Sequence, residues 1–399
     1  MEQVKQILVS MVGMKEYNPD IKESKASFQK MPKTQDELPV RTMKESFDSA
    51  AIPLSSNQAL RERYTSILGQ VRLGRLMEDL DLFAGHIAYK HCSYPNIAPG
   101  DRIPITIVTL SVSQIDILEQ VKPLFDIQVT GHVCWVGSTS LEVVVWLHQK
   151  IEGSLKQITK ALFLMACRNS HNMGPAIVNQ IKAETPEEEA LLKGGEERKI
   201  LRQKMMKESL LIKVPTQEEI QVIHSIFMST LDTKTQFFDR RVLPPQSKWM
   251  KDTTQSTLVF CHPEYRNMHN KIFGGFLIRQ ALELSWIVGF MHWMDVPKLV
   301  RISDIGFYKP VEVGAIVNMT GTVTYTERDY IQIFVTAEAK SIKRKEQTDS
   351  IVFNFTYQLG ESMLRVVPST YLEAMKYLDG RRQYNNVLEF AAKHGVGIE

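Results

Sequence analysis

The sequence predicts an α+β fold made of two similar units, in each of which an antiparallel sheet curves around one long helix. Each half of the chain has a long helical run, followed by four runs rich in Val, Ile, Thr and aromatic residues. Short turns separate these runs, which makes consecutive strands antiparallel. Short segments also match between the halves, namely 74–77 with 275–278 and 140–145 with 330–335. Such matches indicate an internal repeat.

Composition and length narrow the class of protein. The chain has 399 residues, of which 43% are apolar and 23% charged, which is ordinary for a globular protein and long enough for two domains. A net charge of +3 is too small to indicate nucleic-acid binding. No apolar run approaches the roughly 20 residues of a membrane span. The first residues, with the acidic Glu2 and no early arginine, do not resemble a secretory signal or a transit peptide.

The four cysteines and the histidines give no sign of a metal site. Cys92, Cys134, Cys167 and Cys261 lie far apart and form no CxxC pair, so we expect free thiols in a reducing compartment. His262, His269 and His292 lack the spacing of metal ligands. We therefore predict no metal and no cofactor.

In the first half, residues 1–40 are polar and predict an N-terminal arm, and 46–54 predict a strand. Ser55 and Gln58 have the spacing of a capping box, which predicts a helix start. A longer helix is expected over Leu73–His91, entered at Gly74. The expected strands after it are 103–118, 128–136, 140–148 and 157–168, with a hairpin turn at 137–139 between the middle pair.

The middle of the chain changes in composition. Residues 184–207 are dominated by Glu, Lys and Arg and predict a solvated helical linker. Thr216 and Glu219 form a second capping box, which starts an amphipathic helix with Ile220, Ile223 and Phe227 on one face.

The second half repeats the first. A strand at 256–261 precedes a helix that is apolar around most of its circumference and is therefore expected to be buried, ending near Met294. Its four strands are expected at 298–307, 315–326, 330–341 and 350–359. The expected domains are an arm at 1–40, unit one at 41–170, a charged helical linker at 171–235, unit two at 236–365, and a C-terminal helix and tail at 366–399. We expect the two sheets to meet edge to edge, because this buries both edges.

The stretch 267–276 stands out between strand and helix. Asn267 and Asn270 lie in a polar loop, and Gly274, Gly275 and Phe276 lead into the apolar helix. Glycines permit a close approach of backbone to its surroundings, and a helix start offers free N–H groups to a negative oxygen. Taken alone, these asparagines and glycines are most simply turn and capping residues.

The order Asn-x-x-Asn-x-x-Phe-Gly-Gly before a buried helix resembles the hotdog fold of acyl-CoA thioesterases, and two such units resemble a tandem (double) hotdog. Further segments resemble the mitochondrial acyl-CoA thioesterase 9 group over nearly the whole chain. These segments are 41–44, 74–81, 131–137, 240–244, 272–277 and 377–380. The resemblance implies hydrolysis of acyl-CoA to a free fatty acid and CoA, a homo-oligomer, and a mitochondrial location, with a cytoplasmic one as the alternative.

The resemblance also implies a composite site between the units. The family's catalytic asparagine maps onto Asn267, and its acid, seven residues after the second glycine, maps onto Asp81 counted from Gly74. Asp81 is then the general base or, as an alternative, the nucleophile, and Asn267 orients water or substrate. The same counts in the other direction give Ser66 and Leu282, which predict a degenerate second site.

Supporting residues complete the expectation. The amides of Gly274, Gly275 and Phe276 are expected to bind the thioester oxygen, with Asn270 and Gly74 in structural roles. Asp79 and Asp81 lie two apart on a helix, so one can face inward while the other is solvated. Because CoA carries phosphates, basic and polar residues near strand ends are candidates for its binding. These candidates are Arg301, Ser303, Lys309 and Arg344.

Two rival functions remain open. A hydratase of acyl thioesters needs a histidine paired with an acid, which Asn267 and Asp81 do not supply. A non-catalytic acyl-CoA-binding protein is the other alternative, because one site already looks degenerate. For Lys343, Arg344 and Lys345, a solubilising strand edge is as good an explanation as CoA binding.

Overall fold

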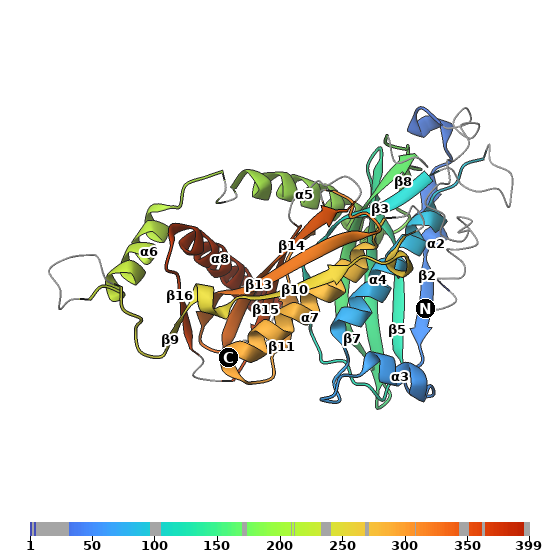
Figure 1. Ribbon diagram of the computed structural model, residues 1–399. Coiled ribbons are helices and arrows are strands. Elements are labelled where there is room, and N and C mark those ends of the chain that lie inside the picture. Colours follow the sequence, from blue (N-terminus) through green and yellow to red (C-terminus); the bar gives the residue numbers. More distant parts are fainter. Residues whose placement is uncertain are drawn as a thin grey trace.

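The computed structural model describes residues 1, 4, 32–95, 105–169, 174–208, 210, 212–232, 241–267, 271–307, 309–342, 351–360 and 364–394. Two long helices, α4 (Leu73–His91) and α7 (Gly274–Trp293), lie against each other between two six-stranded sheets, as Figure 1 shows. The sheets consist of antiparallel pairs. This architecture confirms the predicted tandem hotdog.

The strand orders are the same in both units. The first sheet has the order β12-β3-β7-β6-β5-β2, and the second β10-β13-β14-β15-β11-β4. The first unit contributes β2 (Asp48–Ile52), β3 (Ile105–Val112), β4 (Ile115–Asp116), β5 (Ile127–Val136), β6 (Ser140–Ile151) and β7 (Ser154–Asn169). The second unit contributes β10 (Gln255–Phe260), β11 (Lys298–Ile302), β12 (Ile305–Gly306), β13 (Ala315–Glu327), β14 (Tyr330–Ser341) and β15 (Ile351–Gln358).

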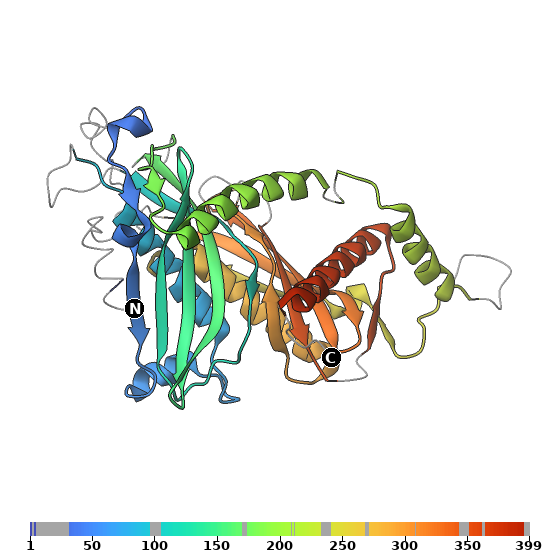
Figure 2. The ribbon, with the colours of Figure 1, turned by 180° about the vertical axis from the view of Figure 1, so that it is seen from behind.

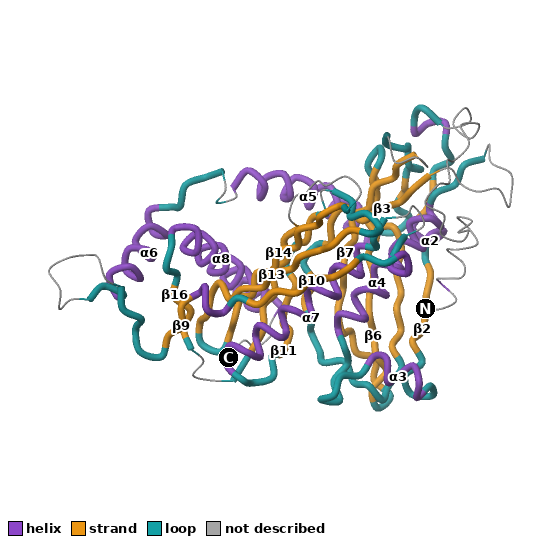
Figure 3. The backbone as a smooth tube through the Cα atoms, in the orientation of Figure 1, coloured by secondary structure: helices purple, strands orange, loops and turns teal. Residues whose placement is uncertain are grey.

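The remaining elements lie outside these sheets, as the secondary-structure colouring of Figure 3 shows. The short strands pair in parallel, β1 (Arg41–Thr42) with β8 (Ile181–Lys182) and β9 (Ser247–Trp249) with β16 (Arg365–Val367). The further α-helices are α2 (Met43–Ser46), α3 (Gln58–Tyr64), α5 (Pro186–Glu208), α6 (Gln217–Ser229) and α8 (Tyr371–His394). The 3₁₀ turns are η2 (Gln35–Glu37), η3 (Met250–Thr253) and η4 (Pro263–Tyr265).

The two units meet through their edge strands, as expected. Val112 of β3 pairs with Ile305 of β12, and Ile115 of β4 pairs with Ile302 of β11. The predicted strands 103–118 and 298–307 are therefore each two strands, because each chain segment leaves its own sheet and joins the other. This exchange gives β3 and β11 a pairing partner from the other unit, while β2 and β10 remain the outer edge strands.

Small details repeat along with the fold. Ser46 at the end of α2 accepts the N–H of Val133 at 3.0 Å, where a bulge interrupts β5. Thr253 at the end of η3 accepts the N–H of Val323 at 3.1 Å, where a bulge interrupts β13. In both units a hydroxyl thus accepts the backbone N–H group at the bulge. The internal repeat therefore extends to these hydrogen bonds.

Helix α5 differs from the prediction of a solvated linker. Arg198 and Arg202 both form ion pairs with Glu142, a residue of β6 with no exposed surface. Gly195 lies so close to Trp135 that an added Cβ would come within 2.3 Å of its ring. The buried carboxylate needs positive partners, and this requirement holds one face of α5 on the first sheet.

The second sheet has its own cover. Helix α8 crosses the sheet face opposite α7, as seen from behind in Figure 2. The Tyr325 and Tyr377 rings stack edge to face at 5.0 Å, and Lys376 lies 5.3 Å from the Phe334 ring. The predicted C-terminal helix is therefore part of the second unit's packing.

Three local predictions are corrected. The N-cap of α3 is Asn57, whose side chain accepts the N–H of Leu60 at 2.9 Å, and not Ser55. The capping box at Thr216 is confirmed, but Ile220 and Phe227 of α6 are exposed. Helix α7 is not buried all round, because Ile287 and Met291 are 45% and 47% exposed. None of the helices in the described part of the chain combines the length and hydropathy needed to cross a bilayer.

Candidate active site

Asp81 lies on α4 with both carboxylate oxygens hydrogen-bonded. Its Oδ2 accepts the backbone N–H of Gly275 at 2.6 Å, and its Oδ1 accepts the Thr109 hydroxyl at 2.7 Å. The residue is 1% exposed. A carboxylate of the first unit thus closes onto the helix start of the second unit, which brings together two of the regions that the sequence singled out.

The local structure explains why this contact forms. The N-cap of α7 is Phe273, which offers no side-chain oxygen, so the first turn of the helix needs an acceptor from elsewhere. Asp81 supplies this acceptor, and the positive end of the helix dipole favours its negative charge.

The glycines at the start of α7 are required for a close approach of the two helices. A Cβ on Gly275 would lie 2.9 Å from Glu78 Cα and 3.0 Å from Asp81 Cβ. A Cβ on Gly274 would lie 3.3 Å from Asp81 Oδ2 and 3.6 Å from Phe307 Cζ. Neither Gly274 nor Gly275 has a positive φ, so backbone conformation is not the reason for glycine at these positions. Gly74 plays the matching part on α4, where a Cβ would lie 3.1 Å from Arg279 Cγ.

Burial raises the pKa of Asp81 to about 6. The hydrogen bonds from Thr109 and Gly275 act in the opposite direction, and the nearby Glu78 charge raises the pKa further. A carboxylate with this pKa is largely ionised at neutral pH and still basic enough to take a proton from water. These are the properties of a general base.

The bond to Asp81 corrects one prediction. The N–H of Gly275 was expected to bind the thioester oxygen, but it is already donated to Asp81. Its neighbours in the first turn, Gly274 and Phe276, are the remaining candidates for that donor.

Asn267 lies in the loop before α7 and closes that loop. Its backbone N–H donates to the Lys271 carbonyl oxygen at 2.6 Å, and its Oδ1 accepts the Lys271 N–H at 3.1 Å. The matching loop of the first unit has the same bond, from Ser66 N–H to Gln70 O at 2.8 Å. Ser66 is thus the structural equivalent of Asn267. Asn270 lies outside the described residues.

The second possible site, formed by α7 and the start of α4, has apolar residues at the positions equivalent to Asp81 and Thr109. Leu282 takes the place of Asp81 on α7. Leu299 takes the place of Thr109, since Leu299 in β11 and Thr109 in β3 both directly precede a bulge. Beneath Leu282, the fully buried Tyr357 hydroxyl lies 2.6 Å from Ser285 Oγ. With two leucines in place of the acid and the hydroxyl, this side lacks an equivalent of the Asp81 carboxylate, and the adjacent Glu283 is paired with Arg72.

Asp79 is buried as well, which corrects the expectation that it or Asp81 would be solvated. It is 6% exposed, and the Tyr64 hydroxyl donates to its Oδ2. Burial raises the pKa of Asp79 to about 6. Its partner Tyr64 is the last residue of α3, so we assign Asp79 to holding the end of α3 against α4.

The predicted CoA-binding residues are scattered. Arg301 is 2% exposed, paired with Asp116 and stacked on Phe390 of α8. Because its guanidinium is buried, the prediction that it binds a CoA phosphate is wrong in this structure. Ser303 is buried and donates to Gln383 Oε1 at 2.9 Å. Lys309 is exposed, two residues after Phe307. Arg344 lies outside the described residues.

Thr109 is the site residue that sequence reasoning missed. The strand 103–118 was predicted, but the bulge between Thr109 and Ser111 shifts which side chains face α4. The only sequence signal is a hydroxyl in an apolar strand, and the same strand also has Thr106 and Ser111.

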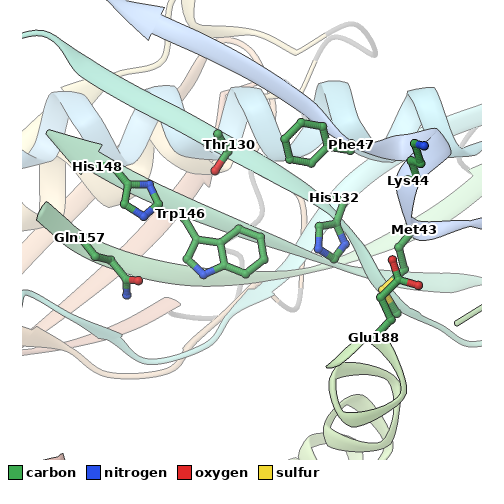
Figure 4. Close-up of a pocket in the computed structure, with 9 residues that line it drawn as sticks. All are labelled: Met43, Lys44, Phe47, Thr130, His132, Trp146, His148, Gln157 and Glu188. Atoms are coloured by element: carbon green, nitrogen blue, oxygen red, sulfur yellow. The ribbon is translucent and has the colours of Figure 1, made fainter. Parts of the chain in front are cut away.

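A groove of about 520 Å³ lies elsewhere, on the face of the first sheet turned away from α4. Figure 4 shows Trp146 at its centre between His132 and His148, with Lys44 and Glu188 at one end. Neither Asp81 nor the α7 start lines it. Within the described residues, no group of three or more His, Cys, Asp or Glu side chains is placed to hold a metal ion.

Comparison with known proteins decides the family. The chain is 39% identical to mitochondrial acyl-coenzyme A thioesterase 9 of Homo sapiens over 387 residues, covering 97% of this chain and 88% of the relative. The chain belongs to the acyl-CoA thioesterase family. This thioesterase is also 38% identical to mitochondrial acyl-coenzyme A thioesterase 10 of Mus musculus, over 90% of this chain and 81% of that one. The predicted resemblance is thereby confirmed.

More distant relatives agree in name. The thioesterase is 31% identical to mitochondrial acyl-coenzyme A thioesterase 4 of Humulus lupulus, over 87% of this chain and 68% of that one. No family model matches the chain.

Two solved structures are similar at low identity. One is an acyl-ACP thioesterase from Bacteroides thetaiotaomicron, at 11% identity and a TM-score of 0.45 over 80% of this chain and 99% of that one. The other is an acyl-CoA hydrolase from Staphylococcus aureus, at 17% identity and a TM-score of 0.34 over 38% of this chain and 96% of that one.

Proposed function

We propose that this thioesterase hydrolyses acyl-CoA to a free fatty acid and CoA at one composite site, with Asp81 as its general base. The observation that carries the proposal is the buried Asp81 carboxylate, held between Thr109 of its own unit and Gly275 of the other. The family relationship supports the substrate class and the mitochondrial location that the names of the relatives state.

The chemistry follows from the groups at the site. Asp81 takes a proton from a water molecule as the water oxygen bonds to the thioester carbon. First-turn amides of α7, those of Gly274 and Phe276, face the negative charge that develops on the carbonyl oxygen. The C–S bond then breaks, and the proton on Asp81 passes to the CoA thiolate. Thr109 and Gly275 orient the carboxylate throughout, and Asn267 shapes the loop that leads into α7.

The rest of the assignment is also a proposal. The degenerate side with Leu282 and Leu299 supports one active site per chain. Of the predicted CoA-binding residues, the exposed Lys309 is the one that we assign to a CoA phosphate. It lies two residues after Phe307, whose ring lies beside Gly274. The apolar residues Ile287 and Met291, exposed on α7, support assembly of several copies. The two hotdog domains span 41–170 and 236–365.

A comparison of two buried aspartates tests the base. Asp81→Asn should lower kcat for release of CoA thiol by about 10³-fold or more, while binding of acyl-CoA persists. Asp79→Asn is the matched control on the same helix, and it should keep kcat within about threefold. Wild-type turnover by Asp81→Asn would reject the assignment, and binding without thiol release by the wild-type protein would favour the non-catalytic alternative.

A further inference from the structure

Three charged side chains lie at the crossing of α4 and α7, one helical turn before Asp81. Glu78 Oε2 accepts a hydrogen bond from Arg75 Nη1 at 2.9 Å and another from Arg279 Nη1 at 2.8 Å. Arg75 shares α4 with Glu78, whereas Arg279 reaches across from α7. The Glu78 and Arg279 side chains are 20% and 17% exposed, so solvent screens this ion pair only in part.

The two members of the cross-helix pair occupy equivalent positions in the repeat. Glu78 follows Gly74 by four residues, and Arg279 follows Gly275 by four. In a symmetric dimer of identical subunits, equivalent positions at the axis carry the same residue, so two like charges would face each other. The fused chain has opposite charges there, and the negative one lies on the helix that carries Asp81.

We propose that Glu78 is a positioning residue for the Asp81 site, because through Arg279 it fixes the first turns of α7 against α4 and so sets the Asp81–Gly275 hydrogen bond. The backbone contact supports this role: a Cβ on Gly275 would lie 2.9 Å from Glu78 Cα and 3.1 Å from Glu78 O. Arg279 lies one turn after Gly275, so its ion pair holds the same part of α7 that donates to Asp81. The inference rests on the proposed role of Asp81.

The charge of Glu78 gives this role a signature that simple packing lacks. The groups that face Asp81 are Glu78 on its own helix, the Thr109 hydroxyl from β3 and the Gly275 amide from α7. Arg75 and Arg279 neutralise Glu78. Removing the Glu78 charge therefore moves the acid limb of the kcat profile to lower pH. Removing Arg279 leaves Glu78 less neutralised and moves that limb to higher pH.

The experiment compares Glu78→Gln, Arg279→Gln and Glu78→Asp in the full chain. For each variant, kcat and KM for thiol release from acyl-CoA are measured between about pH 5 and 9, together with the melting temperature. Glu283→Gln is the matched control, because Glu283 pairs with Arg72 across the same two helices but beside the degenerate side.

We expect Glu78→Gln to lower kcat about 3- to 10-fold with KM within about twofold. Its acid limb should move down by about half a pH unit, and that of Arg279→Gln should move up by a similar amount. Glu78→Asp should keep the wild-type limb, as should Glu283→Gln. The inference is overturned if Glu78→Gln keeps the wild-type kcat, or if neither glutamine variant at the crossing moves the limb, while Asp81→Asn is inactive. An active Asp81→Asn would instead reject the proposed function itself.

Discussion

The carboxylate of Asp81 caps a helix of the other unit, since its Oδ2 accepts the N–H of Gly275, 194 residues later in the chain, at 2.6 Å. A capping acceptor is normally the residue just before a helix, and here that residue is Phe273. One hydrogen bond thus joins the two units and orients the proposed base.

Thr109→Val should weaken catalysis while leaving the fold intact. Valine has nearly the shape of threonine but removes the hydroxyl that donates to Asp81 Oδ1. Because that hydrogen bond lowers the pKa of Asp81, its loss raises the pKa, and the acid limb of the kcat profile should move to higher pH. We expect kcat to fall about 10-fold at neutral pH.

The control for Thr109 lies on the same strand. Ser111 Oγ is buried and has no hydrogen-bond partner in the described part of the chain. Ser111→Ala should therefore leave the pH profile unchanged. Equal profiles for both variants would show that Thr109 does not act on Asp81.

Gly275→Ala should inactivate the thioesterase. The new Cβ would lie 2.9 Å from Glu78 Cα, so the backbone of α7 must move and the hydrogen bond to Asp81 lengthens. We expect loss of about 10²-fold or more in kcat and a lower melting temperature. Gly85→Ala on α4 is the control, because nothing lies within 4 Å of its Cβ position. That variant should keep activity and gain about 0.5–1 kcal/mol in the free energy of unfolding. Full activity of Gly275→Ala would contradict the need for this close approach.

Asp81→Asn should stabilise the protein at high pH. The folded-state pKa of Asp81 is raised from 3.8 to about 6, so the folded protein binds this proton more tightly than the unfolded chain does. The stability linked to this proton is complete below pH 3.8 and is lost as the pH rises through about 6. The shift corresponds to about 3 kcal/mol. Asparagine does not titrate, so the free energy of unfolding of the variant relative to wild type should rise by about this amount between pH 4 and pH 8. Urea denaturation at both values measures it, and a pH-independent difference would contradict the raised pKa.

Arg301→Met should destabilise the junction of the units without affecting CoA binding. The buried guanidinium pairs with Asp116 across the edge where the sheets meet, and its removal leaves that carboxylate without its partner. We expect a loss of about 3–5 kcal/mol in the free energy of unfolding. Arg381→Gln breaks the exposed pair with Glu218 and should cost less than about 1 kcal/mol. A raised KM for acyl-CoA with normal stability would restore Arg301 as a CoA ligand.

Sequence patterns predicted most of the framework and half of the site. The bounds of α4 follow from apolar spacing. The assignment of Asp81 depends on the resemblance to the thioesterase family, counted from Gly74, because a lone aspartate on a helix is usually exposed. Thr109 could not be found, since a bulge decides which side chain of its strand faces Asp81. Arg301 was misassigned for a different reason: a basic residue at a strand end is usually exposed, and its burial under α8 depends on how a distant helix docks.

The two leucines and the tyrosine on the other side of the helix pair have a consequence for how the protein balances stability against activity. An ionised carboxylate in the interior costs folding free energy, and a symmetric dimer meets this cost twice. Of the two equivalent positions in the fused chain, only that of Asp81 imposes it, whereas the other side has Leu282, Leu299 and Tyr357, which contribute packing. Duplication within one chain thus separates two roles: one half of the interface carries the proposed base, and the other half contributes packing free energy that a buried carboxylate does not.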